Sequence, residues 1–190
     1  GLDGAPHVDA AVSVCKTFIQ HHIPYGVLAK NSLDQLSRYK ILVLPNVLMM
    51  DAEEVEAIRK YVEAGGCLYA SKYTSLTDKQ GNRQSDFMLA DLFGVSHRDR
   101  TKENYTYIAP SETAKDLLSP YSPERPLGLE TGQFIVEAQP GTEVLGRIVL
   151  PYTDPGDGNE FASIHSNPPG ISTDHPALVR REFGKGRVLY

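Results

Sequence analysis

The sequence contains no tryptophan, and its only cysteines are Cys15 and Cys67. Two cysteines make neither a disulfide framework nor a zinc site, so the fold does not depend on either. Carbohydrate-binding platforms usually include tryptophan, because its wide ring stacks on a sugar. The absence of tryptophan therefore disfavours an independent lectin-like module.

The sequence also lacks an excess of basic residues and a long apolar run. With 19 Lys and Arg against 24 Asp and Glu, its formal net charge of −5 disfavours a dedicated nucleic-acid binder. Its apolar runs fall far short of the ~18 residues that a membrane-spanning helix needs, and its first residues do not resemble a signal peptide. Hydrophobic residues at 41% and charged residues at 23% are typical of a folded soluble domain. We expect neither nucleic acid nor a membrane as a partner.

Familiar ligand-binding motifs are missing as well. No G-x-G-x-x-G or Walker-type loop is present, so nucleotide binding has no support. Asp154, Asp157, Asn159 and Glu160 offer oxygen atoms that suit Ca²⁺, but their spacing is not that of an EF-hand, which favours a solvated turn. We therefore expect no cofactor and no metal.

Both ends of the sequence fall inside expected secondary structure. A helical pattern begins almost directly after Gly1–Gly4, and Gly186–Tyr190 has the pattern of a strand. A natural terminus seldom stops inside an apolar strand. The sequence therefore predicts a fragment of a longer protein, in which catalytic residues can lie elsewhere.

Helical and strand patterns alternate over residues 8–97. The expected helices cover residues 8–22, a turn at 33–39, the stretch between Asp51 and Gly65, and residues 87–93, and the expected strands are 25–29, 41–44 and 67–70. Short links between alternating helices and strands indicate βαβ crossovers and a parallel sheet.

Two of these strands, Ile41–Leu44 and Cys67–Ala70, are continuously apolar, which is typical of strands covered on both faces. The helix between them begins with Asp51 and Glu54 at capping-box spacing and ends at Gly65, which adopts left-handed geometry cheaply. We predict that the two strands are adjacent, central and parallel.

Residues 104–190 change to a hairpin pattern. Apolar runs at 134–136 and 144–150 flank the Pro140-Gly141 turn, and runs at 177–183 and 187–190 flank a second glycine-containing turn. These patterns predict two β-hairpins, whose antiparallel strands extend the parallel sheet or lie beside it.

Several motifs follow one another in an order that resembles a known family. They are Tyr39–Asn46, the helix after Asp51, Tyr61–Leu68, Leu89–Val95, Phe161–Gly170, Asp174–Pro176 and Phe183–Val188. The first four resemble the glutamine-amidotransferase-like domain of bacterial glycoside hydrolases, of which the β-galactosidase trimerisation domain is the best-known member. The last three resemble the C-terminal part of such domains in hypothetical glycosyl hydrolases and α-fucosidase-like proteins.

The resemblance implies a three-layer, flavodoxin-like α/β fold of the class I glutamine-amidotransferase type. Residues 1–190 would form a single domain that follows a (β/α)₈ catalytic barrel in a bacterial parent, which is cytoplasmic or exported. The implied role is non-catalytic: the domain assembles or braces a β-galactosidase or α-fucosidase-like enzyme, contacts its other domains and other copies (a trimer is one form), and meets carbohydrate only through the parent. Two alternatives remain open, a flavodoxin-like module that binds a small molecule or sugar at the strand ends, and a hydrolase or amidotransferase.

Ser71 and Cys67 are the candidate nucleophiles of that last alternative. Active amidotransferases hold a nucleophilic cysteine at a strand-to-helix elbow between glycines, which permit the strained turn. Ser71 lies at the comparable strand end without a flanking glycine, and no His-x-Glu pair follows it. Cys67 begins the strand, where a small buried apolar residue is expected. We therefore expect no catalytic residue in this chain.

The stretch from Ile164 to His175 is the most unusual in the sequence. Its double proline and glycine predict a rigid turn. Its histidines are ten residues apart, which matches no standard zinc pattern, although a nearby carboxylate can orient an imidazole. We expect this stretch to face another subunit or the catalytic barrel. The candidate interface residues are His165, Asn167, Pro168, Pro169, Gly170, Asp174 and His175.

Overall fold

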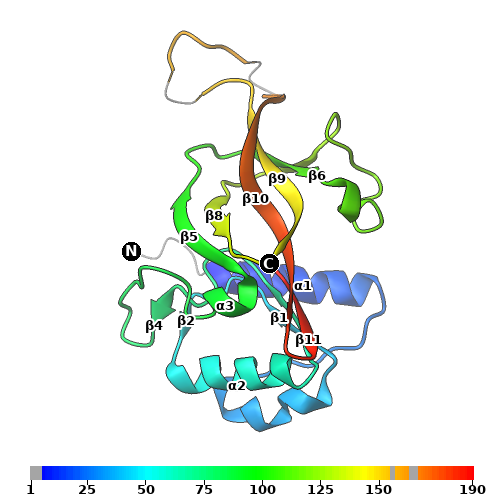
Figure 1. Ribbon diagram of the computed structural model, residues 1–190, viewed down its shortest axis with the longest axis vertical. Coiled ribbons are helices and arrows are strands. Elements are labelled where there is room, and N and C mark those ends of the chain that lie inside the picture. The colour runs from blue at the N-terminus through cyan, green and yellow to red at the C-terminus, as the bar shows by residue number, and fades with distance from the viewer. Residues whose placement is uncertain (1–5, 155–156, 163–166) are drawn as a thin grey trace. The chain divides into compact units, whose positions relative to one another are not determined.

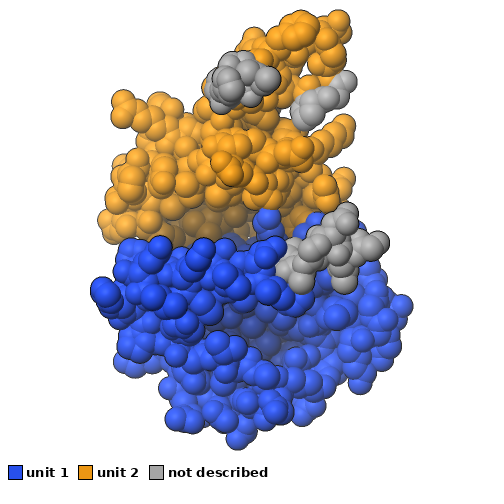
Figure 2. All heavy atoms as spheres, turned by 180° about the vertical axis from the view of Figure 1, so that it is seen from behind, with its two compact units in different colours: residues 1–93, 181–190 blue, residues 94–180 orange. Residues whose placement is uncertain are grey.

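The structure is a computed structural model that describes residues 6–154, 157–162 and 167–190. The chain divides into two compact units, coloured separately in Figure 2: unit 1 comprises residues 1–93 and 181–190, and unit 2 comprises residues 94–180. In the described ranges, no helix combines the length and apolar character needed to cross a bilayer.

Unit 1 contains the α-helices and the parallel strands (Figure 1). Its helices are α1 (Pro6–Gln20), the 3₁₀ helix η1 (Lys30–Arg38), α2 (Ala52–Glu63) and α3 (Ala90–Phe93), and its strands are β1 (Ile41–Leu44), β2 (Met49–Met50), β3 (Cys67–Ala70), β4 (Thr77–Asp78) and β11 (Gly186–Leu189). All four predicted helical segments are confirmed, but residues 25–29 form no strand. Among the described residues β1 pairs with β3 alone, so residues 25–29 have no strand beside them to pair with.

The helix α2 begins and ends as its sequence predicts. The Asp51 carboxylate accepts a hydrogen bond from the Glu54 amide at 3.0 Å, and the Glu54 carboxylate accepts one from the Asp51 amide at 2.8 Å. At the other end Gly65 has a φ of 119°, and the Gly66 amide donates to the Tyr61 carbonyl at 3.0 Å. These bonds satisfy backbone groups that a helix leaves free at its ends.

The sheet of unit 1 places β3 between β1 and β11, and both neighbours run parallel to it. The predicted adjacency and parallel pairing of Ile41–Leu44 and Cys67–Ala70 are confirmed. Cys67–Ala70 is central within this unit, but Ile41–Leu44 is wrong as a central strand because β1 lies at the edge of the sheet. Apolar character alone did not distinguish the two positions.

Unit 2 consists mainly of antiparallel strands. They are β5 (Val95–Arg100), β6 (Thr106–Pro110), β7 (Leu127–Leu129), β8 (Phe134–Ala138), β9 (Glu143–Pro151) and β10 (Pro169–Phe183, whose last residues belong to unit 1), with a short 3₁₀ helix η2 (Glu112–Ala114). The predicted hairpin of residues 134–136 and 144–150 is wrong: β8 pairs with β5, whereas β9 pairs with β6 and β10. The strands themselves were predicted, but a turn signal does not fix which strand each one pairs with.

The predicted three-layer flavodoxin-like parallel sheet is wrong. The main sheet has seven strands in the order β1-β3-β11-β10-β9-β6-β7, and only β1, β3 and β11 are parallel. From β10 to β7 the pairs are antiparallel, so the chain forms a mixed, strand-rich sheet. The class I glutamine-amidotransferase type of fold is not supported either. The physical reason is that long strands in residues 104–183 pair directly with one another instead of being separated by crossover helices.

Candidate functional site

The loops after β1 and β3 contain three non-glycine residues with left-handed backbone. Asn46, Lys72 and Ser75 have φ values of 57°, 50° and 62°. Such conformations are costly for residues with a Cβ and persist where the surrounding structure holds them. The Asn46 side chain is buried and accepts a hydrogen bond from the Tyr73 amide at 3.0 Å. These residues lie at the carboxyl ends of parallel strands, where open α/β sheets commonly bind ligands.

Ser71 lies inside this network of hydrogen bonds. Its hydroxyl oxygen accepts from the Asn46 amide at 3.1 Å, and its carbonyl accepts from the Thr74 hydroxyl at 2.7 Å. Among the described residues, no histidine is hydrogen-bonded to Ser71. The left-handed elbow falls on Lys72, one residue after the candidate nucleophile. The arrangement therefore ties two loops together, and in the part of the chain that the structure describes no histidine is placed to activate the hydroxyl.

Tyr190 contacts the same loop after β3. The Tyr190 hydroxyl donates to the Lys72 carbonyl at 2.7 Å, and its ring stacks on Phe93 with a centroid distance of 4.9 Å and an interplanar angle of 18°. Burial raises the pKa of the Tyr190 hydroxyl above its usual value, so it stays protonated as a donor. A tyrosine used in this way stabilises the Lys72 elbow.

Cys67 is an exposed free thiol at the start of β3. The sequence predicted a buried position, but Cys67 lies on the face of the parallel sheet that the helices leave partly open. Its neighbour in register on β11 is Arg187. In the described residues no histidine, cysteine or carboxylate cluster suitable for a metal ion occurs, at Cys67 or elsewhere.

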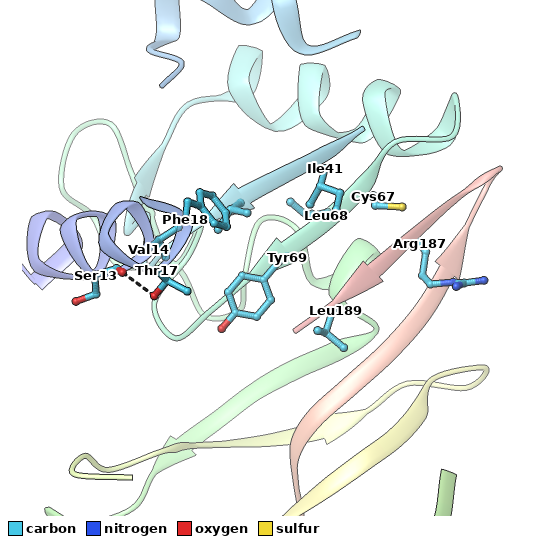
Figure 3. Close-up of a pocket in the computed structure, with 11 residues that line it drawn as sticks. Ser13, Val14, Thr17, Phe18, Ile41, Cys67, Leu68, Tyr69, Arg187 and Leu189 are labelled. Carbon is cyan, nitrogen blue, oxygen red and sulfur yellow. Dashed lines mark hydrogen bonds between the residues drawn. The ribbon is translucent and has the colours of Figure 1, made fainter. Parts of the chain in front are cut away.

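An apolar trough of about 510 Å³ lies on this open face, between α1 and the parallel strands (Figure 3). Val14 and Phe18 of α1 form one wall, and Tyr69 and Leu189 contribute to the floor. The hydroxyl of Thr17 in the wall already donates to the Ser13 carbonyl at 3.0 Å. The trough therefore lacks the convergent polar groups of a typical small-molecule site. Sequence reasoning missed it, because its apolar lining residues, such as Val14, Phe18 and Leu189, have the pattern of ordinary core residues.

Unit 2 holds the described part of the predicted interface segment. The Asn167 side chain accepts from the Thr153 amide at 3.1 Å and donates to the Thr153 hydroxyl at 2.7 Å. The Tyr107 hydroxyl donates to the Asn167 carbonyl at 2.6 Å, and the Tyr152 amide donates to the Pro168 carbonyl at 2.7 Å. These bonds close the base of the segment that joins β9 to β10. A Cβ on Gly170 would collide with the Tyr152 backbone, so only glycine fits this base.

The remaining candidates of this segment do not form one cluster. Asp174 and His175 are exposed; the Asp174 carbonyl accepts from Arg147, and the His175 amide donates to the Thr173 hydroxyl at 3.2 Å. Pro168 and Pro169 are also exposed. His165 lies outside the described residues.

Known proteins place the chain in a family. Residues 8–110 match the family model described as the β-galactosidase trimerisation domain. No curated protein sequence matches the chain.

Solved structures of glycoside hydrolases share the fold. A catalytic mutant of Gan42B, a GH42 β-galactosidase from G. stearothermophilus, has a TM-score of 0.72 and 17% identity over 100% of this chain. The cold-adapted β-galactosidase from Rahnella sp. R3 has a TM-score of 0.60 and 18% identity over 82% of this chain. Isoenzyme 2 of α-L-fucosidase from Paenibacillus thiaminolyticus has a TM-score of 0.56 and 24% identity over 80%.

The chain spans only part of each of these proteins: 24% of the Gan42B mutant, 20% of the Rahnella enzyme and 21% of the fucosidase. The family model covers more than half of the chain, which confirms the resemblance to the trimerisation domain noted in the sequence. The chain thus belongs to the β-galactosidase trimerisation domain family, a non-catalytic domain of glycoside hydrolases.

Proposed function

We propose that residues 1–190 are one domain of a longer bacterial glycoside hydrolase of the β-galactosidase type, and that this domain assembles and braces the enzyme. The observation that carries the proposal is the family match over residues 8–110. The short share of Gan42B that the chain spans supports a parent whose sugar-cleaving carboxylates lie in another domain. Carbohydrate then reaches the enzyme through that domain.

The hydrogen bonds around Ser71 support a role without covalent chemistry. Its hydroxyl accepts from the Asn46 amide, and a serine nucleophile needs a base that removes its proton. Cys67 is exposed but has Arg187, not a histidine, as its neighbour on β11. The described neighbours of these two side chains therefore support a role without nucleophilic catalysis.

We propose further that the segment from Asn167 to His175 docks onto another subunit or the catalytic barrel. Asn167 and Tyr107 close its base, so little chain entropy is lost on binding. Two aromatic residues in the adjoining stretch, Tyr152 and Phe161, are 60% and 83% exposed. Exposed aromatic side chains are typical anchors of protein interfaces.

The proposal is tested by comparing the parent enzyme with the 190-residue chain. The parent should hydrolyse an aryl β-galactoside and sediment as an oligomer, whereas the chain alone should hydrolyse neither that substrate nor glutamine. Hydrolysis of either compound by the purified chain, abolished by Ser71→Ala or Cys67→Ala, would contradict the proposal.

The docking segment is tested in the parent with Asn167→Ala combined with Pro168→Ala. We expect a lower sedimenting mass if the segment joins subunits, or an unchanged mass with lower kcat/KM if it contacts the barrel. Wild-type values of both quantities would mean that the segment is only a turn. Gly158→Ala, in the exposed loop between β9 and β10, is the matched control, because a Cβ there meets no atom within 4 Å.

A further inference from the structure

The parallel sheet of unit 1 is well covered on one face only. On the covered face Leu68, Ala70 and Val188 are buried. Gly186 belongs to this face, since a Cβ there would collide with the Val62 carbonyl of α2. On the opposite face Ile41 is 62% exposed and Tyr69 is 36% exposed. Parallel sheets occur almost only with both faces covered by helices, so the second face is incomplete.

The helix α1 covers only one side of this second face. Figure 3 shows Phe18 of α1 beside the carboxyl end of β1, whereas Arg187 and Leu189 of β11 lie on the side away from α1. The trough of about 510 Å³ is lined by residues of α1 and of all three parallel strands, β1, β3 and β11. Its floor therefore extends from the strand beside α1 across to β11.

The shape and chemistry of the trough fit one further helix. An added strand pairs with the edge of a sheet, whereas a helix packs across its face. Helices that pack side by side lie roughly 8–10 Å apart, so a helix beside α1 would lie over β3 and β11. One helix presents large apolar side chains at positions i, i+3, i+4 and i+7, which suit a floor of Tyr69 and Leu189. Arg187 at the rim is already paired with Glu182 at 3.4 Å, so its charge needs no partner on the added helix.

We propose that the open half of this face is the seat of one amphipathic helix, supplied by the part of the parent polypeptide outside residues 1–190. The inference rests on the proposed function, in which the chain is one domain of a longer glycoside hydrolase. The occupant is taken from the same polypeptide because the chain spans only 24% of the Gan42B mutant, so a relative of that length has ample chain for a helix. It is not a second copy, because the floor consists of strand residues next to core positions, which is the construction of a domain interior.

Cys67 reports on this seat, since it is an exposed thiol on the trough. The experiment measures the rate at which iodoacetamide alkylates Cys67 in a Cys15→Ser background, in the 190-residue chain and in the parent enzyme. In the chain we expect the rate of a free exposed thiol at every protein concentration. In the parent we expect alkylation to be at least about tenfold slower, because a packed helix exposes the thiol only through local unfolding.

A second probe and a control keep the result interpretable. Arg187→Cys in a background of Cys15→Ser and Cys67→Ser should show the same protection in the parent, which guards against a local effect at Cys67. Met49→Cys in that background, at a 54% exposed position outside the trough, should react equally fast in both polypeptides.

Two outcomes would overturn the inference. Equal alkylation of Cys67 in chain and parent would mean that nothing covers the seat, although the proposed assembly role would stand if the parent still sediments as an oligomer. Protection that appears in the chain alone and increases with protein concentration would identify a second copy as the occupant instead.

Discussion

Gly186 shows how a single residue sets the packing of unit 1. It has no side chain, and this lets α2 approach β11 closely: a Cβ would meet the carbonyl oxygens of Val62 and Gly66. Both obstacles are backbone atoms, which cannot move aside by changing a rotamer. The requirement for glycine follows from this close approach, since no positive φ is recorded for Gly186.

Gly186→Ala should therefore destabilise the chain by about 1–3 kcal/mol, the usual cost of overpacking a core. The free energy of unfolding, measured by urea denaturation, checks this value. Gly158→Ala is the control, because a Cβ at that position meets no atom within 4 Å. If both substitutions cost the same, the close approach of α2 is wrong.

Lys72 illustrates what a sequence does not reveal at the residue scale. Its left-handed backbone, with φ of 50°, follows from the hydrogen bonds around Ser71 and from the Tyr190 hydroxyl that donates to its carbonyl. Positions with left-handed backbone are usually occupied by Gly or Asn, which makes them visible in a sequence. A lysine gives no such signal, so the sequence indicates only Ser71, the hydroxyl nearest to the strand end.

At the scale of elements, α2 depends on Asp51. The Lys30 ammonium, which bonds the Asp51 carboxylate, and the Glu54 amide both lower the pKa of Asp51 below its usual value. A carboxylate with a lowered pKa contributes stability that is fully present above the ordinary aspartate pKa and is lost as the pH falls through the lowered value. The free energy of unfolding should therefore fall at acidic pH, as Asp51 is protonated and its stabilising contribution is lost.

Asp51→Asn tests this contribution, because asparagine retains the cap but neither titrates nor pairs with Lys30. The wild type should have the higher melting temperature at neutral pH, and the difference should shrink as the pH falls below the ordinary aspartate range. A difference that is constant from neutral to acidic pH would contradict the assigned role. Asp51→Ala should be less stable than Asp51→Asn at neutral pH, because it also removes the cap.

The segment between β9 and β10, residues 152–168, is called the arm here, and its base is held by the side chain of Asn167. Asn167→Ala removes the bonds to Thr153, and it should open the arm without unfolding unit 2. Amide hydrogen exchange should speed up at Thr153, whose amide loses its acceptor, while exchange at Ile148 in the buried part of β9 stays slow. Uniform acceleration along β9 would mean that Asn167 supports the whole strand pair.

The elements were predictable where the information is local. The capping box of α2 and its end at Gly65 follow from side chains within a few residues, and both are present. Pairing is not local: β8 pairs with β5 across many residues, and β1 lies at an edge although Ile41–Leu44 is as apolar as a central strand. Periodicity identifies a strand but does not name its neighbour. The trough was unpredictable for the same reason, since it depends on which face lacks a cover.

At the scale of the whole molecule, the proposed function depends on contacts between this chain and other parts of the parent enzyme. Belonging to the trimerisation domain family accounts for a fold whose strand ends are tied by hydrogen bonds around Ser71 instead of opening into a reactive site. In the proposed function, the open apolar face of unit 1 and the segment between β9 and β10 of unit 2 contact other parts of the enzyme. Each unit presents one of them, so bracing and docking can be disrupted separately.

The most direct test of the non-catalytic role is the kcat/KM of the parent enzyme with Ser71→Ala and Cys67→Ala combined. Because neither side chain touches substrate in this account, the double variant should keep kcat/KM within about twofold of the wild type, which is a small change in transition-state stabilisation. A loss of about 10³-fold with unchanged melting temperature and sedimenting mass would assign a catalytic role to this chain and contradict the account.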